Sequence, residues 1–118
     1  MYNKITIIGN LTKDPEIKYG EKGAVGMMRI AVNTRVNEEI KETLFINVIC
    51  FGNTAENATQ YLNKGSKIFV EGRLRERQWE DQNGVKRNMY EIVANRIIFL
   101  DKKDGNGEHD EELINEPF

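Results

Sequence analysis

A single helical segment in a chain otherwise rich in β-branched and aromatic residues constrains the fold more than any other feature. Residues 53–64 carry apolar side chains at helical spacing, at Ala55, Ala58 and Leu62. Asn53, with Glu56 three residues later, resembles a capping box, and Gly65 stands where a C-terminal cap glycine is expected. The apolar face is narrow, which suits a helix that plugs one end of a barrel.

Five β-rich segments surround this helix, three before it and two after it, separated by glycine, asparagine and proline. The predicted strands are residues 4–10, 27–35, 43–51, 67–80 and 88–100. A further short strand is possible at 16–19, and residues 36–42 are predicted to form an exposed hairpin loop. This order predicts an OB-fold, a five-stranded Greek-key barrel with one short helix between strands three and four. The alternatives are another small barrel or a β-sandwich.

Alternation along the strands assigns their side chains to faces. In the third strand the expected core face is Leu44, Ile46, Val48 and Cys50, and the other face is Phe45, Asn47, Ile49 and Phe51. In the fourth strand Ile68, Val70 and Leu74 are expected to point inward. Asn83-Gly84 indicates a two-residue type I′ turn between the last two strands. The resulting register pairs Asp81 with Lys86, Glu80 with Arg87, Glu76 with Glu91, Leu74 with Val93 and Val70 with Ile97.

Charge divides the chain into two parts. Residues 1–100 hold 15 lysines and arginines against 12 acidic residues, a balance of +3, and residues 101–118 hold two against seven, a balance of −5. We therefore expect one domain over residues 1–100 and a short, disordered acidic tail over 101–118. A basic body favours an anionic ligand.

Several functional classes find no support in the composition. The lone histidine, His109, lies in the tail, so we expect no catalytic triad and no metal site, and the protein is predicted not to be an enzyme. Apolar runs fall short of the ~20 residues that cross a bilayer. The single cysteine, Cys50, excludes an internal disulfide and is expected to be a small buried side chain. The predicted location is cytoplasmic, with no membrane partner and no cofactor.

The segment 72–79 carries the clearest functional signal. As a strand it places Arg73, Arg75, Arg77 and Trp79 on one face. Like charges aligned along a strand repel one another, so this row of arginines is not expected to stabilise the fold. Arginines ending in an indole match a phosphate backbone whose bases can stack. The alternative is a solvated barrel face on which these arginines pair with nearby carboxylates.

Aromatic side chains strengthen the nucleic-acid interpretation. Phe45 and Phe51 lie on one side of the third strand, about 20 Å apart at ~3.3 Å per residue. They would hold different parts of a strand laid across the sheet. Trp79 lies near a hairpin tip among polar neighbours, which favours an exposed stacking role.

Several motifs resemble those of the bacterial single-stranded DNA-binding proteins. They are the opening residues 3–10, Asp14-Pro15-Glu16, the block at 63–75, Trp79-Glu80-Asp81-Gln82 and the ending Glu116-Pro117-Phe118. The resemblance implies a homotetramer of OB-fold subunits, associated with the nucleoid, that binds single-stranded DNA in replication, recombination and repair.

Roles follow from this resemblance residue by residue. It implies base stacking by Phe45, Phe51 and Trp79, and phosphate contacts by Arg35, Lys64, Arg73, Arg75 and Arg77. The family also uses its acidic C-terminus to recruit replication and repair proteins, a role that would fall here to Glu116, Pro117 and Phe118. Two rival hypotheses stay open: a protein-interaction module whose arginine face docks an acidic protein, and an RNA-binding barrel.

Overall fold

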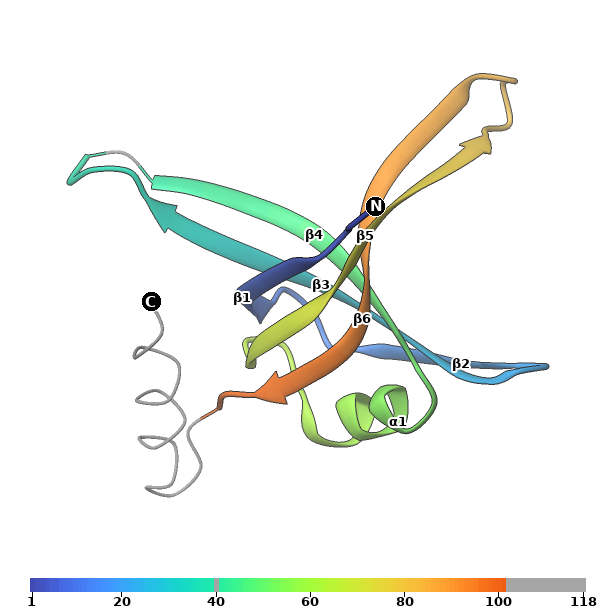
Figure 1. The fold of residues 1–118 in the computed structure, drawn as a ribbon, viewed down its shortest axis with the longest axis horizontal. Coiled ribbons are helices and arrows are strands. Elements are labelled where there is room, and N and C mark those ends of the chain that lie inside the picture. The colour runs from blue at the N-terminus through green and yellow to red at the C-terminus, as the bar shows by residue number, and fades with distance from the viewer. Residues whose placement is uncertain (40, 102–118) are drawn as a thin grey trace.

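Five strands close into a barrel in the computed structural model, which describes residues 1–39 and 41–101 (Figure 1). In chain order the elements are β1 (Ile5–Leu11), β2 (Glu16–Gly20), β3 (Gly23–Arg35), β4 (Lys41–Phe51), α1 (Gly52–Tyr61), β5 (Lys67–Glu80) and β6 (Lys86–Phe99). The helix lies across one end of the barrel, between β4 and β5 in the chain. The predicted OB-fold with its single helix is confirmed for the described residues.

The sheet runs in the order β1-β5-β6-β4-β3-β2, and a second pairing between β1 and β3 closes the barrel. Leu11 pairs with Ile30 at this closure. The β4–β6 pairing is parallel and the other pairings are antiparallel. The short β2 lies outside the closed barrel and forms a hairpin with β3, which confirms the possible extra strand and lengthens β3 back to Gly23.

Aliphatic side chains fill the barrel. The fully buried ones include Ile30, Val48, Ile68, Val70 and Ile92. Ala55 and Ala58 of α1, with Leu62 just after it, complete this core from one end. Cys50 is also fully buried, as expected of a small apolar side chain. Burial raises the pKa of its thiol to about 11, so this sulfur is protonated and unreactive at neutral pH.

The helix differs from its prediction at both ends. It begins at Gly52, and its N-cap residue is Phe51, so Asn53 lies in the first turn and the predicted capping box is wrong. It ends at Tyr61 because backbone N–H groups shortly after this residue form tertiary hydrogen bonds in place of helical ones. The backbone N–H of Lys64 donates to Asp14 Oδ1 at 2.7 Å, and that of Gly65 donates to the Leu11 carbonyl at 2.8 Å. These tertiary bonds replace another helical turn.

Three face assignments were also wrong. Leu44 is 50% exposed and Leu74 is 37% exposed, although both were expected in the core. The β3–β4 and β5–β6 hairpins project beyond the barrel (Figure 1), and the core does not reach far along them. Ile49 is buried instead, because it lies between Met27 of β3 and Val93 of β6 in neighbouring strands.

The β5–β6 turn contains one residue more than predicted. The Gly84 N–H donates to the Asp81 carbonyl at 3.0 Å, the Asp81 N–H donates to the Val85 carbonyl at 2.9 Å, and Gly84 has φ +76°. This pattern is a turn followed by a glycine bulge, rather than a two-residue type I′ turn. The tip register therefore pairs Glu80 with Lys86, and the four predicted pairs nearest the tip are wrong.

A second irregularity, at Gly72, restores the predicted register in the barrel. The pairing shifts between Glu71 and Gly72, so that Val70 faces Ile97 as expected. A Cβ on Gly72 would lie 2.1 Å from the Val93 carbonyl oxygen and 2.8 Å from the Ala94 Cα. Only glycine allows this close approach of the two backbones.

Candidate nucleic-acid interface

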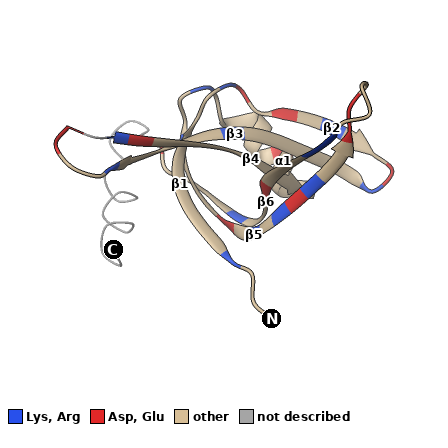
Figure 2. Cartoon of the chain, turned by 90° about the horizontal axis from the view of Figure 1, so that it is seen from above, with Lys and Arg blue, Asp and Glu red and all other residues tan. Residues whose placement is uncertain are grey.

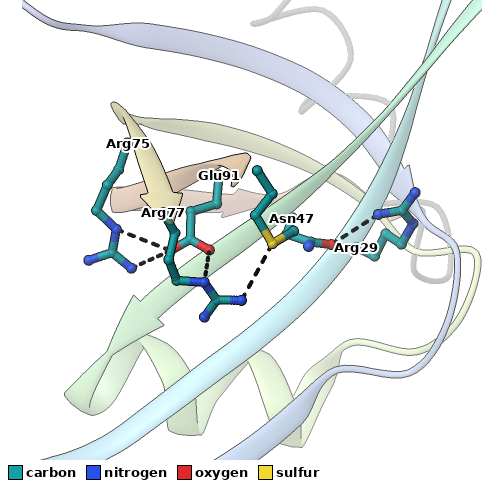
Figure 3. Close-up of polar contacts among 6 residues, drawn as sticks. Arg29, Asn47, Arg75, Arg77 and Glu91 are labelled. Atoms are coloured by element: carbon teal, nitrogen blue, oxygen red, sulfur yellow. Dashed lines mark hydrogen bonds and ion pairs between the residues drawn. The ribbon is translucent and has the colours of Figure 1, made fainter. Parts of the chain in front are cut away.

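Four strands bring polar side chains into one row across the outer face of the sheet. Arg29 of β3 pairs with Asn47 of β4, Asn47 with Glu91 of β6, and Glu91 with Arg75 of β5. Directly paired residues on adjacent strands point to the same side of a sheet. Figure 3 shows these side chains along one line, with the Arg29 guanidinium donating to Asn47 Oδ1 at 3.2 Å.

Glu91 is the centre of this row. Its side chain is only 1% exposed, yet it carries a carboxylate on the same face as the arginines. Arg75 Nε donates to Glu91 Oε2 at 3.1 Å, and Arg75 Nη2 reaches the same oxygen. Arg77 Nε lies 3.8 Å from the other oxygen, Oε1. A buried carboxylate is stable only when it is paired, so Glu91 fixes two guanidinium groups.

The three arginines of β5 are therefore not equivalent. Arg75 is 39% exposed and shares its charge with Glu91, and Arg77 is 54% exposed and also contacts Met89 Sδ at 3.4 Å. Arg73 has no ion-pair partner anywhere in residues 1–39 and 41–101, and it is exposed. In Figure 2 blue and red segments alternate along the β5–β6 hairpin, so basic and acidic residues are interspersed there.

The three predicted stacking residues all present large apolar surfaces to solvent. Phe45 is 51% exposed, Phe51 is 50% exposed and Trp79 is 44% exposed. Two of the rings carry an arginine over one face: Arg29 lies 5.4 Å from the centre of Phe45, and Arg77 lies 5.8 Å from the Trp79 ring. These cation–π contacts orient rings that would otherwise move freely.

Arg29 and Glu91 were missed as members of this face by sequence reasoning. Both become visible only with the correct strand register. The register of the β3–β4 hairpin places Arg29 opposite Asn47, and the shifted β5–β6 turn places Glu91 opposite Arg75 rather than Glu76. The predicted Glu76–Glu91 repulsion is replaced by an attraction.

Two predicted phosphate contacts lie elsewhere. Arg35 ends β3 and pairs with Lys41 at the projecting β3–β4 hairpin, and Lys64 lies in the loop after α1. Both side chains are exposed.

Acidic side chains lie at the tip of the β5–β6 hairpin and on the face of the hairpin opposite to the arginines. Hydrogen bonds from Tyr90, Gln78 and Asn88 lower the pKa of Glu76. A hydrogen bond from Arg87 is the main cause that lowers the pKa of Asp81, helped by the backbone N–H groups of Val85 and Asn83. The same Glu76 contact raises the pKa of Tyr90.

Other classes of site receive no support within residues 1–39 and 41–101. No group of three or more histidine, cysteine, aspartate or glutamate side chains there could hold a metal ion. Nor does that part of the chain contain a helix long and apolar enough to cross a membrane. The predicted partner-binding residues Glu116, Pro117 and Phe118 lie outside the described residues.

Comparison with known proteins agrees with the geometry. Residues 2–100 match the sequence model of the single-strand binding protein family. Single-stranded DNA-binding proteins of Helicobacter hepaticus and Wolinella succinogenes are 45% and 44% identical over 114 and 108 residues, covering 92% and 87% of this chain. Single-stranded DNA-binding protein A of Bacillus subtilis is 38% identical over 91% of the chain. The chain spans 67%, 67% and 64% of these relatives. It belongs to the single-strand binding protein family.

Proposed function

We propose that this chain binds single-stranded DNA without marked sequence preference, by base stacking and phosphate neutralisation. The observation that carries the proposal is the outer face of β4, β6 and β5, which carries exposed aromatic rings on β4 and a row of arginines ending in an exposed tryptophan on β5. Phe45, Phe51 and Trp79 supply flat surfaces for bases, which every nucleotide can use. Arg73, Arg75 and Arg77, with Arg35 and Lys64 at the periphery, supply positive charge for phosphates.

The direct test is titration of the full chain with oligo-dT while following Trp79 fluorescence. We expect strong quenching that weakens as salt rises, because counterion release makes affinity salt-dependent. Absence of quenching and of any mobility shift at low salt would contradict the proposal. It would favour the protein-interaction module. Tighter binding of a matched RNA oligomer than of the DNA would favour the RNA-binding barrel.

The tail is proposed to recruit replication, recombination and repair proteins. Glu116, Pro117 and Phe118 would form the contact, and the surrounding acids would supply charge. Deleting Pro117 and Phe118 should abolish capture of such partners and leave oligo-dT affinity unchanged. Unchanged capture would refute this part of the proposal alone.

Assembly and location complete the proposal. We infer a homotetramer of these OB-fold subunits, with residues 1–100 as the DNA-binding domain and 101–118 as the tail. The protein would act in the cytoplasm, on the nucleoid, as a binding protein rather than an enzyme. Native mass spectrometry tests the assembly, since a monomer or dimer at micromolar concentration would contradict it.

A further inference from the structure

A hollow at the Phe51 end of the face joins the proposed interface to the N-terminal segment. It is bounded by Tyr2 and Lys4 of the N-terminal segment, Phe51 of β4, Arg73 of β5, and Val93 and Asn95 of β6. Phe51 and Arg73 are already proposed DNA contacts. The segment that carries Tyr2 brings new side chains to the same place.

The N-terminal segment is held against β5 by one side chain. Asn3 Nδ2 donates to the Leu74 carbonyl at 2.7 Å, and Asn3 Oδ1 accepts from the Leu74 N–H at 3.0 Å. Ile5 pairs with Gly72 in the β1–β5 ladder, so position 3 falls opposite Leu74 in the same register. The Asn3 amide thus continues the ladder by one step and fixes where Tyr2 leaves the barrel.

Tyr2 itself is poorly explained by packing. It is 87% exposed, so it adds little to the core. Yet the anchor at Asn3 holds its backbone beside β5. An exposed ring on a fixed segment loses less conformational entropy on binding than one on a free end.

The chemistry of the hollow matches one nucleotide. The rings of Tyr2 and Phe51 offer faces for a base, and the Asn95 carboxamide both donates and accepts hydrogen bonds, so it suits the edge of any base. Arg73 lacks a carboxylate partner among the described residues and is available to a phosphate. Glu71 is occupied by Lys4, whose Nζ lies 3.5 Å from Glu71 Oε2, so its repulsion of the phosphate is reduced.

We propose that this hollow is a nucleotide subsite for single-stranded DNA, in which Tyr2 is an additional stacking residue. The subsite extends the face from Phe51 of β4 across β6 to Arg73 of β5 and the N-terminal segment. It rests on the proposed function, because it needs a DNA strand that already lies across β4 and β5.

Affinity of the full chain for oligo-dT tests the subsite. Tyr2→Ala should weaken binding about fivefold or more at fixed salt, the low end of the loss for one base–aromatic stack. Tyr2→Phe should stay within about twofold, because stacking uses the ring and not the hydroxyl. The matched control is Tyr19→Ala, which removes a 70% exposed tyrosine from β2, outside the hollow, and should change nothing.

Two further readouts separate a contact from a general effect. Oligo-dT carrying 5-iododeoxyuridine should cross-link under ultraviolet light to the tryptic peptide of residues 1–4. Asn3→Ala should reproduce most of the Tyr2→Ala loss although the ring is still present, because the anchor is gone. Wild-type affinity in Tyr2→Ala, with no cross-link in residues 1–4, would overturn the subsite and leave the proposed function standing. If the wild-type chain does not bind oligo-dT, the proposed function itself fails.

Discussion

The two ends of the basic row on β5 look alike in sequence and differ in structure. At the barrel end Arg73 is exposed, lies beside Phe51 and has no acidic partner in the described part of the chain. At the hairpin end Arg75 and Arg77 share the buried carboxylate of Glu91, and Arg77 lies over Trp79. The barrel end therefore offers a free cation, whereas the hairpin end offers cations and a ring in fixed positions.

Alternation along a strand therefore does not by itself define a binding surface. An unpaired arginine contributes its full charge to a phosphate but must be ordered when it binds. A paired arginine contributes less net charge but loses less entropy. The hairpin end thus presents side chains that are already ordered, and the barrel end presents the cation with the more available charge for a phosphate.

The greatest loss of stability should come from Gly72, which directly precedes the basic row at its barrel end. In Gly72→Ala the new Cβ would lie 2.1 Å from the Val93 carbonyl oxygen, a backbone atom that moves only if β5 and β6 separate. We expect a loss of about 3 kcal/mol or more in the free energy of unfolding, the range of severe overpacking. Urea denaturation measures it.

The control for this change is Gly20→Ala, where no atom lies within 4 Å of the added Cβ. Its stability should stay within about 0.5 kcal/mol of the wild type. Equal, small effects at both glycines would show that the close approach of the two backbones at Gly72 does not require glycine.

The next largest effect should follow from Glu91→Ala. Removing one partner of a buried pair leaves the others uncompensated, which costs about 3–5 kcal/mol when every group is buried. Arg75 and Arg77 are partly exposed, so water recovers part of this, and we expect about 2 kcal/mol. Glu71→Ala, which removes the partner of exposed Lys4, should cost less than about 1 kcal/mol. A Glu91 effect no larger than that of Glu71 would mean that burial of the carboxylate does not set the two ion pairs apart.

A smaller effect distinguishes Arg73 from Arg75 in DNA binding. Both substitutions by alanine remove one positive charge from the same strand, so a difference between them reports direct phosphate contact. Arg73→Ala should reduce the slope of log affinity against log salt by about 0.7, the value for one contact to a single strand. Arg75→Ala should change the slope less, because Glu91 already engages that guanidinium. Equal changes in slope would make the two ends electrostatically equivalent.

The barrel, its helix and the exposed aromatic residues could be predicted from the sequence, because each depends on local periodicity. Phe45, Phe51 and Trp79 are exposed as expected, and β5 has its predicted bounds. The role of Glu91 was not accessible, since it depends on register. One extra residue in the Asp81–Val85 turn and the shift at Gly72 decide which side chain faces Arg75. The Asn3 anchor was also hidden, because its partner is 71 residues away.

The smallest effect concerns pH and separates the two ends once more. Hydrogen bonds lower the pKa of Glu76 from its unfolded value of 4.5 and that of Asp81 from its unfolded value of 3.8. The stabilisation that these bonds give is therefore present above the unfolded pKa values, and it is lost as the pH falls through the lower folded pKa values. Both groups lie on the β5–β6 hairpin and are exposed, so acid should loosen the hairpin end before the barrel unfolds. Trp79 fluorescence should therefore change at higher pH than the far-ultraviolet circular dichroism of the barrel. In a Glu76→Gln, Asp81→Asn double variant the two transitions should move together, because the two hairpin carboxylates with lowered pKa values no longer titrate. Coincident transitions in the wild-type chain would mean that the hairpin is no less firmly held than the barrel.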